Sequence, residues 1–411
     1  MTFGPYGVGR IDGKTVMVPN AVPGDVLAIA VESERHDYTR GRITRVVTPG
    51  AARRTPPCPF VPRCGGCDWQ QIDYPAQVRI KADLIAAEFR RSLGLELDAS
   101  DLVEAAPAEF GYRSRIRLKT GAGGALGFHE LGTNLLVPVD HCIVAAPGLE
   151  LPVELARALG RRCIEVEAVV AGEGEAGEVL VAHLAQAPGA DEVARTRRVF
   201  ESHGGIRGIV LSGGGEREVV GDATVRVELE AGLVLLADAD QFSQVNREQN
   251  RKLVAAVMEM AAIGEHVSVL DLFCGAGNFS LPAARRGARV TGVDSDALAV
   301  ATAARNAARM GFDDARFLAM KAAETARFLE RARYRPDTVI VDPPRTGALD
   351  LMEAMVRLRP PHLIYVSCDT STLVRDLQIL VANHYQIKRV RAFDFFPNTH
   401  HAELVVHALL T

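Results

Sequence analysis

The chain has 411 residues, which at roughly 150 residues per domain predicts two or three domains. Its formal net charge of −4 excludes a polycationic nucleic-acid coat, and 48% hydrophobic with 24% charged residues is a composition typical of globular rather than disordered proteins. No apolar run approaches the roughly 18–20 residues of a membrane span, and the N-terminal stretch lacks the apolar core of a signal peptide. We therefore expect a cytoplasmic protein that does not enter a membrane.

Short β-rich runs alternate with turns over the first 50 residues. Residues 16–18 and 26–31 are strand-like and are separated by Pro19-Asn20 and Pro23-Gly24, a spacing that predicts a small β-barrel. Between positions 35 and 54, six arginines accompany a single acid, Asp37, which indicates either a solvated edge or a phosphate-facing surface. The six are Arg35, Arg40, Arg42, Arg45, Arg53 and Arg54.

A loop dense in Pro, Cys and Gly follows at residues 55–68, before a helix predicted over residues 75–93. The loop contains Cys58, Cys64 and Cys67, and a fourth cysteine, Cys142, lies far downstream in Asp-His-Cys. Seven cysteines are few for a disulfide scaffold of this length, and in a reducing compartment they are better explained as ligands or catalysts. Spacing alone leaves zinc and an iron–sulfur cluster both open.

Residues from about 100 to 235 alternate short strands, glycine turns and one or two helices, which predicts a middle α/β or α+β region. Arg113, Arg115, Arg117 and Lys119 recur at a spacing of two, so in a strand all four side chains share one face. No acid lies among them. We interpret this row as a second candidate contact with a polyanion.

From about residue 240 the pattern changes to a regular alternation of strands and helices. Apolar strands are predicted near residues 267–270, 290–293, 339–341 and 363–366, with a helix over 296–310 and two further β-like runs at 386–393 and 403–409. Alternation at this period predicts βαβ units in a mostly parallel sheet that is covered on both faces.

A candidate nucleotide-binding turn, Asp-Leu-Phe-Cys-Gly-Ala-Gly-Asn-Phe at residues 271–279, follows the first of these strands. Gly275 and Gly277 permit a tight turn, and Asp294 after the next strand is placed to accept hydrogen bonds from ribose hydroxyls. The third glycine of a pyrophosphate site is replaced by Ser280, which favours a nucleoside ligand such as S-adenosylmethionine. Asp342-Pro343-Pro344-Arg345 forms a rigid loop after a later strand, where ligands bind in open α/β sheets.

Cys368 ends the following strand and precedes a polar helix start, an environment that lowers the pKa of a thiol, although the neighbouring Asp369 opposes that effect. A methyl transfer to C5 of a pyrimidine needs such a nucleophile at C6 and a general base for the C5 proton. Glu403, His400 and His401 are candidates for the base, and residue type alone favours a histidine near neutral pH.

With these motifs the chain resembles the RNA uracil-5-methyltransferases, in particular the bacterial enzymes that make 5-methyluridine in 23S ribosomal RNA. The resemblance covers essentially the whole chain and includes Gly-Val-Gly-Arg and Val-Pro-x-x-x-Pro-Gly-Asp of an N-terminal TRAM domain, an oligonucleotide-binding barrel. It also includes the nucleotide turn, Val-Asp-Pro-Pro-Arg, Tyr-Val-Ser-Cys and the ending Phe-Pro-x-Thr-x-His-x-Glu, carried by Phe396, Pro397, Thr399, His401 and Glu403. The chain begins almost at its Gly-rich turn, so we expect the family's first barrel strand to be missing. Asp369-Thr370 replaces the family's usual Asn-Pro.

The resemblance implies a role for each candidate residue. Cys368 is then the nucleophile and Glu403, rather than a histidine, is the base. Five residues fall on the family's positions for binding S-adenosylmethionine, namely Gln244, Phe273, Asn278, Asp294 and Asp342. Cys58, Cys64, Cys67 and Cys142 match the four ligands of the family's [4Fe-4S] cluster.

We therefore expect a multidomain α/β protein. Residues 1–50 are predicted to form the TRAM-like barrel, residues 51–235 an iron–sulfur and central RNA-binding region, and residues 236–411 a Rossmann-like methyltransferase domain. The predicted partner is RNA, first of all 23S ribosomal RNA, with the target uridine flipped out of its stack by a monomeric enzyme. Three alternatives stay open: a transfer-RNA uracil methyltransferase, an amine methylase, and an iron–sulfur RNA-binding protein with a degenerate methylase domain.

Overall fold

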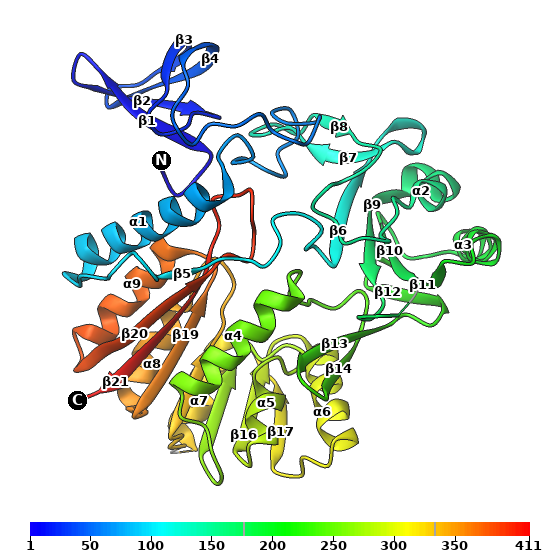
Figure 1. Ribbon diagram of the computed structural model, residues 1–411. Coiled ribbons are helices and arrows are strands. Elements are labelled where there is room, and N and C mark those ends of the chain that lie inside the picture. Colours follow the sequence, from blue (N-terminus) through cyan, green and yellow to red (C-terminus); the bar gives the residue numbers. More distant parts are fainter. Residues whose placement is uncertain (176, 333) are drawn as a thin grey trace.

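The computed structural model describes residues 1–175, 177–332 and 334–411. These residues form a mixed α/β structure with sheets of four, seven and eight strands and one separate hairpin (Figure 1). The N-terminal sheet lies at the top left of Figure 1, the seven-stranded sheet at the right, and the eight-stranded sheet below them. None of the helices described is both long enough and apolar enough to cross a bilayer.

The N-terminal sheet is small and open. Its strands are β1 (Tyr6–Ile11), β2 (Lys14–Pro19), β3 (Val26–Glu34) and β4 (Tyr38–Thr48), in the order β1-β2-β4-β3. Strands β2 and β4 are parallel, whereas the other two pairs are antiparallel. Val16, Val18 and Ala21 form its core. The predicted strands are confirmed, but the closed barrel is not, because β1 and β3 lie at opposite edges of the sheet.

The middle region is built on the seven-stranded sheet, in the order β12-β11-β10-β9-β6-β7-β8. The strands and helices of this region are β6 (Arg115–Thr120), η1 (Ala122–Gly124), β7 (Leu126–His129), β8 (Leu136–Pro138), α2 (Val153–Leu159), η2 (Gly160–Arg162), β9 (Cys163–Val170), β10 (Glu178–Leu184), α3 (Ala190–Ser202), β11 (Ile206–Gly213) and β12 (Glu216–Gly221). Helices α2 and α3 pack on this sheet through Leu155, Leu159 and Val199. The hairpin of β13 (Thr224–Glu230) and β14 (Leu233–Asp238) follows and packs against Leu281 and Ala307 of the C-terminal region.

The C-terminal region contains the eight-stranded sheet, in the order β17-β16-β15-β18-β19-β21-β20-β5. Its elements are α4 (Arg247–Met260), β15 (Ser268–Leu272), α5 (Ser280–Arg285), β16 (Arg289–Asp294), α6 (Ala297–Arg309), β17 (Ala315–Ala319), α7 (Ala322–Arg331), β18 (Thr338–Val341), α8 (Leu349–Leu358), β19 (His362–Ser367), α9 (Thr370–Val381), β20 (Tyr385–Phe393) and β21 (Glu403–Leu410). The first five strands in the sheet order are mutually parallel, and only β21 runs antiparallel to its neighbours. The strand order reverses at β15, which places the ligand-binding crevice of an open α/β sheet between β15 and β18. The predicted parallel sheet is thus confirmed.

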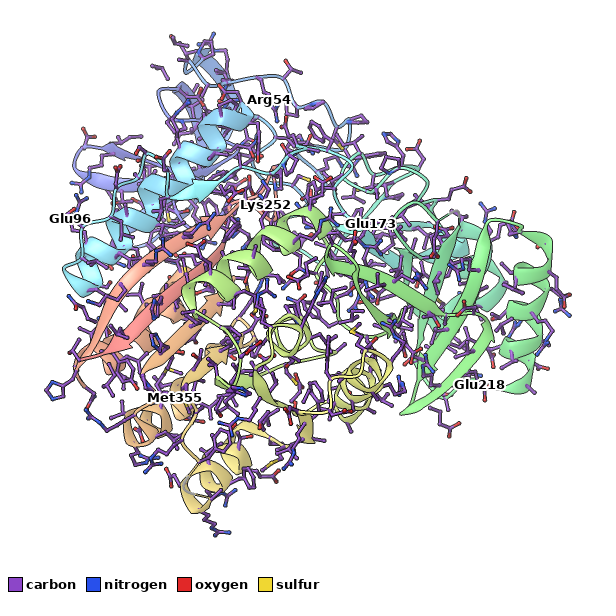
Figure 2. The ribbon with its side chains drawn as sticks, turned by 60° about the horizontal axis from the view of Figure 1, so that its bottom comes forward. Arg54, Glu96, Glu173, Glu218, Lys252 and Met355 are labelled. Carbon is purple, nitrogen blue, oxygen red and sulfur yellow. The ribbon has the colours of Figure 1, made fainter. Side chains whose placement is uncertain are left out.

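Helix α1 (Tyr74–Leu93) and the short strand β5 (Val103–Glu104) join this sheet from earlier in the chain. The Asp73 side chain caps α1 at the Ala76 N–H, and Gly94 ends the helix in the left-handed conformation. Ile85 and Phe89 of α1 belong to the same core as the buried leucines of α9, and β5 pairs with β20. Side chains fill the space between these layers, and Arg54 lies near α1, close to the N-terminal sheet (Figure 2). The domain limits at residues 51 and 235 stay a prediction, since α1 and β5 pack on the C-terminal sheet.

Candidate active site

The predicted catalytic and cofactor residues follow neighbouring parallel strands, so the fold brings them to one edge of the sheet. Phe273 follows β15, Asp294 ends β16, Asp342 follows β18 and Cys368 follows β19. Because the carboxyl ends of parallel strands meet at the same edge, these four residues converge on the crevice where the strand order reverses.

The turn after β15 has the backbone geometry of a nucleotide site. Phe273, Gly275 and Gly277 all have positive φ angles, of 63°, 52° and 103°. A Cβ at Gly277 would lie 2.9 Å from Leu281, whereas one at Gly275 would meet nothing within 4 Å. Gly277 is therefore needed for close packing of α5, and Gly275 keeps the turn open toward the crevice.

The acid after β16 is held in place by the turn that it faces. Asp294 accepts hydrogen bonds from the N–H groups of Gly275 (2.9 Å) and Asp296 (2.9 Å). Together with Phe273, Asp294 lines a cavity of about 30 Å³ that is otherwise bounded mainly by apolar side chains and Thr325. A fixed carboxylate at the mouth of an apolar cavity suits the ribose and base of a nucleoside.

Two other predicted cofactor residues, Asn278 and Gln244, lie in the chain segments that flank α4 and β15. Asn278 forms two reciprocal amide hydrogen bonds with Asn250 of α4, at 2.8 and 3.1 Å. Gln244 is half-buried between β14 and α4, two residues before Asn246, which caps α4. Neither is among the described residues that line the Asp294 cavity.

The pairing of β19 with β21 places Glu403 opposite Cys368. Ser367 pairs with Leu404 in the antiparallel ladder, so the next residue of β19 faces the residue that begins β21. Glu403 is only 4% exposed, and Cys368 is half-buried. The predicted nucleophile and base are therefore neighbours across two adjacent strands, although 35 residues separate them along the chain.

Burial and neighbouring acids raise the pKa of three acidic groups at this site. Burial raises the pKa of the Cys368 thiol to about 11, the charges of Glu403 and Asp342 add to the rise, and Arg345 opposes it. Burial also raises the pKa of Glu403 well above its usual range, and Asp342 contributes. The pKa of Asp342 is raised to about 7 by burial and by Asp294. The sequence left open whether the start of α9 lowers the pKa of this thiol, and burial outweighs any such lowering.

A cavity of about 50 Å³ opens beside Cys368, and both predicted histidines line it. His400 contacts the carboxylate of Asp68 through Nδ1, and its ring lies 3.9 Å from that of His401. Burial, together with electrostatic interactions with His400 and Arg345, lowers the pKa of His401 to about 3. His401 is therefore neutral near pH 7 and lies 3.4 Å from an Arg345 nitrogen.

The four predicted metal-ligand cysteines line one cavity of about 250 Å³. Burial raises the pKa of Cys64, Cys67 and Cys142, and the charges of the other cysteines add to each rise. Arg113 also lines this cavity, and its guanidinium lies 5.4 Å from the centre of the Phe396 ring. Within residues 1–175, 177–332 and 334–411, no three His, Cys, Asp or Glu side chains are arranged to hold a single metal ion.

The row of four cations is largely neutralised, contrary to its interpretation as a free polyanion contact. Strand β9 pairs with β6 and places Glu165 and Glu167 opposite the row. Lys119 binds Glu165, Arg115 binds Glu167 (3.1 Å) and Arg117 binds Glu167 (2.7 Å). Two of the six N-terminal arginines are also used internally, in ion pairs of Arg53 with Asp25 and Arg54 with Glu109. Arg35, Arg40, Arg42 and Arg45 are exposed.

Several polar residues at the site were not assigned a role from sequence. Arg345, seen only as part of a motif, faces both Cys368 and His401. Asp271 at the end of β15 is fully buried, and burial together with Asp342 and Asp294 raises its pKa to about 7. Lys81 of α1 lines the Cys368 cavity, and Asn398 supports the chain that leads to Glu403. The sequence around these two residues shows no pattern that would indicate a contact with the site.

Comparisons with known proteins agree with this geometry. The profile of the tRNA (Uracil-5-)-methyltransferase family matches residues 230–409. The 23S rRNA (uracil(1939)-C(5))-methyltransferase RlmD of Pectobacterium atrosepticum is 32% identical, over 97% of this chain and 89% of its own length. The same enzyme of Edwardsiella ictaluri is 33% identical, over 97% and 91%.

One solved structure is similar over nearly the whole chain. It is the crystal structure of the Pyrococcus abyssi tRNA (uracil-54, C5)-methyltransferase in complex with S-adenosyl-L-homocysteine. The two share 25% identity and a TM-score of 0.72, over 98% of this chain and 99% of the other. The similarity in sequence and in structure therefore extends well beyond the C-terminal sheet. On these grounds the chain belongs to the RNA uracil-5-methyltransferase family.

Proposed function

We propose that this protein transfers a methyl group from S-adenosylmethionine to C5 of a uridine in RNA. The observation that carries the proposal is the meeting of Cys368 and Glu403 across β19 and β21, at the sheet edge that also holds Asp342 and the nucleotide turn. An amine methylase has no need for a buried thiol at that position, because an amine already has a lone pair.

Phe273 and Asp294 would hold the adenosine part of the methyl donor, with Gln244, Asn278 and Asp342 around it. The apolar cavity and the fixed carboxylate fit a nucleoside. When bound, S-adenosylmethionine supplies an electrophilic methyl group and leaves as S-adenosylhomocysteine.

The chain's own residues perform the remaining steps. The Cys368 thiolate, favoured by Arg345, adds to C6 of the uracil, and the electron pair of the C5=C6 bond moves toward O4. C5 then takes the methyl group. The Glu403 carboxylate accepts the C5 proton, the C5=C6 bond re-forms, and the S–C6 bond breaks to release the thiolate.

The decisive experiment is trapping with RNA that carries 5-fluorouridine, in which no C5 proton is present to be removed. The wild-type enzyme with S-adenosylmethionine should form a covalent adduct that denaturing electrophoresis detects and mass spectrometry maps to Cys368. Cys368→Ala should form none and lose methylation, whereas Cys163→Ala, which removes a buried thiol of β9, should behave as wild type. Methylation without any adduct would overturn the mechanism.

The first candidate substrate is 23S ribosomal RNA, because the relatives that match over nearly the full length act on it by name. The similar archaeal structure makes transfer RNA the second candidate. Mapping 5-methyluridine in both RNA classes from cells with and without the gene distinguishes them. Loss of the modification only from transfer RNA would reject the ribosomal assignment.

We also propose that Cys58, Cys64, Cys67 and Cys142 hold a [4Fe-4S] cluster in a structural role. Four half-buried thiols around one cavity supply the donor set of such a cluster, whose ligands are spread over several irons. A single zinc ion is the alternative for four thiolates, and it would need its sulfurs to converge at about 2.3 Å.

Iron and sulfide analysis of anaerobically purified protein tests this assignment. We expect about four irons and four sulfides per chain, as a [4Fe-4S] cluster requires, with the charge-transfer absorption of the cluster. Cys67→Ser should lower the iron content, and Cys274→Ser should not. One equivalent of zinc without sulfide would contradict the proposal.

We further propose that the N-terminal sheet is a TRAM-like module that contacts RNA phosphates through its exposed arginines. Arg42 and Arg45 lie on β4 and are exposed, and Arg40 is flanked by the rings of Tyr6 and Tyr38 at 5.4 and 5.7 Å. Exposed guanidinium groups on one small sheet suit a phosphate backbone better than the neutralised row on β6.

A further inference from the structure

The segment that connects β20 to β21, residues 394–402, is called the β20–β21 loop below. It carries the histidines of the Cys368 cavity and leads directly into Glu403. Within it, Asn398 is fully buried and has a φ angle of 69°. This left-handed conformation is uncommon for residues other than glycine, and a non-glycine residue keeps it only where the surroundings enforce it.

The surroundings of Asn398 satisfy each of its polar atoms. Its N–H donates to Oε1 of Gln77 (2.8 Å), and its Oδ1 accepts from Nε2 of the same side chain (3.2 Å). Its Nδ2 donates to the Glu109 carbonyl (3.0 Å), and its Oδ1 also accepts from Arg54 (3.0 Å). Its carbonyl accepts from the Trp69 N–H (3.0 Å). All of these partners precede residue 110, whereas Asn398 lies close to the end of the chain.

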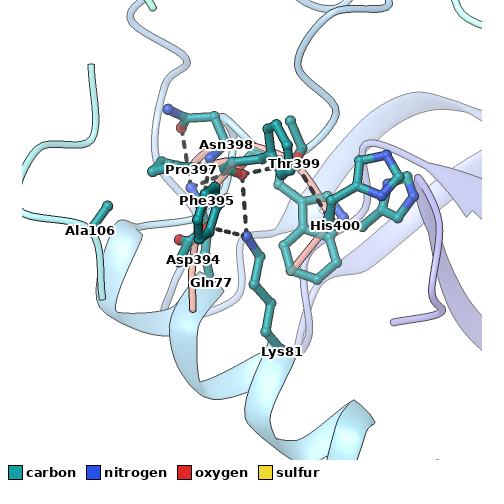
Figure 3. Close-up of polar contacts among 12 residues, drawn as sticks. Gln77, Lys81, Ala106, Asp394, Phe395, Pro397, Asn398, Thr399 and His400 are labelled. Atoms are coloured by element: carbon teal, nitrogen blue, oxygen red, sulfur yellow. Dashed lines mark hydrogen bonds and ion pairs between the residues drawn. The ribbon is translucent and has the colours of Figure 1, made fainter. Parts of the chain in front are cut away.

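A buried ion pair fixes the start of the same loop. Lys81 of α1 donates to Asp394 (2.7 Å) and to the Phe396 carbonyl (3.2 Å), and both charged side chains are at most 1% exposed. Figure 3 shows Gln77 and Lys81 reaching from α1 to the loop. The loop is therefore attached to α1 at two points, of which Asn398 is the one nearer to Glu403.

We propose that Asn398 is a positioning residue for the methyl transfer. Its hydrogen bonds tie the β20–β21 loop to four residues of the N-terminal part of the chain. The loop in turn holds His400 and His401 at the Cys368 cavity and keeps Glu403 next to Cys368. Asn398 does not touch the reacting atoms. The inference rests on the proposed roles of Cys368 and Glu403, and it adds a residue at a position that the C-terminal motif leaves unspecified.

The competing explanation is that the strand ladder alone holds Glu403. Phe393 pairs with Glu403 between β20 and β21, so the base has a backbone anchor as well. If that anchor suffices, changes at Asn398 alter stability but leave the proton-removal step intact. Two reactions separate these explanations: turnover on uridine RNA requires the base, whereas adduct formation on 5-fluorouridine RNA requires only the nucleophile and the methyl donor.

Asn398→Gly is the informative variant, since glycine adopts the positive φ angle without strain but lacks the side-chain hydrogen bonds. We expect its turnover to fall about 10²-fold, because a small displacement of a catalytic group lowers the rate by about that factor. Adduct formation should stay close to that of wild type. Asn398→Asp keeps the acceptor for Arg54 and should recover part of the turnover. Gln77→Ala should resemble Asn398→Gly, and the double variant should lose little more, because both changes break the same contact.

Asn383→Ala is the matched control, because the Asn383 Nδ2 donates to the Ile379 carbonyl near the end of α9 (2.8 Å), away from the β20–β21 loop. It should keep wild-type turnover. If Asn398→Gly turns over as fast as wild type, or if its turnover and adduct formation fall in parallel, the positioning role is wrong. Failure of the wild-type enzyme to form an adduct would instead reject the proposed function, so the two failures are distinguishable.

Discussion

The two walls of the Cys368 site are held in different ways. On the sheet side, Asp294, Asp342 and Cys368 lie at the carboxyl ends of parallel strands, and Glu403 faces Cys368 through the register of β21. On the other side, the β20–β21 loop is fixed largely by side chains from the first 110 residues. The comparison teaches that the C-terminal sheet carries the groups proposed for the chemistry, whereas side chains of the N-terminal part of the chain hold the loop that lines their cavity.

The largest effect on turnover is expected from Glu403, the proposed base on the sheet side. Glu403→Gln keeps the shape of the side chain but cannot accept a proton, and general-base catalysis contributes about 10²–10⁴-fold. Turnover should fall by that factor, and the methylated Cys368 adduct should accumulate on ordinary uridine RNA. Rapid-quench denaturing electrophoresis measures both. If turnover fell without any adduct, Glu403 would be required before methyl transfer and not after it.

The loop side is expected to give the largest effect on stability. Lys81→Met removes one partner of a fully buried ion pair and leaves Asp394 without its counter-charge, which costs about 3–5 kcal/mol. The free energy of unfolding in urea should fall by that amount. Lys14→Met, which breaks the surface ion pair with Glu34, is the control and should change stability by less than about 1 kcal/mol. Equal losses of unfolding free energy in the two variants would show that the buried ion pair stabilises the fold no more than the surface pair does.

The sheet side could be predicted from sequence, and the loop side could not. Alternating apolar strands and helices fix the strand direction, so the sequence alone places residues such as Cys368 and Asp342 at one edge of the sheet. Asn398 and Gln77 are 321 residues apart, and no periodicity connects them. The cations of β6 illustrate the same limit: a spacing of two predicts a shared face but not that β9 brings Glu165 and Glu167 opposite to it.

A smaller effect is expected from Arg345, whose charge influences the pKa of Cys368 on the sheet side. Arg345 lowers the pKa of Cys368, which burial raises to about 11, so Arg345→Ala should raise that pKa further. Below the pKa, the thiolate fraction then falls about tenfold for each unit of the rise. The rate of alkylation of Cys368 by iodoacetamide, followed between pH 7 and about 10, should increase with pH in both proteins and be lower in the variant. An unchanged rate would mean that Arg345 acts on the substrate alone.

The smallest effect concerns RNA binding by the arginines of the N-terminal sheet and by the row of cations on β6. The sequence alone predicts a polyanion contact for both groups. Arg42 on β4 is exposed, with its nearest acid at 3.8 Å, whereas Arg117 on β6 is held by Glu167 at 2.7 Å. Replacing a residue that contacts one phosphate lowers the slope of log affinity against log salt by about 1. We therefore expect Arg42→Gln to reduce this slope for 23S-derived RNA and Arg117→Gln to leave it nearly unchanged, as measured by fluorescence anisotropy at several salt concentrations. The reverse result would show that RNA displaces the acids of β9, and that the row on β6, rather than the N-terminal sheet, forms the phosphate-binding surface.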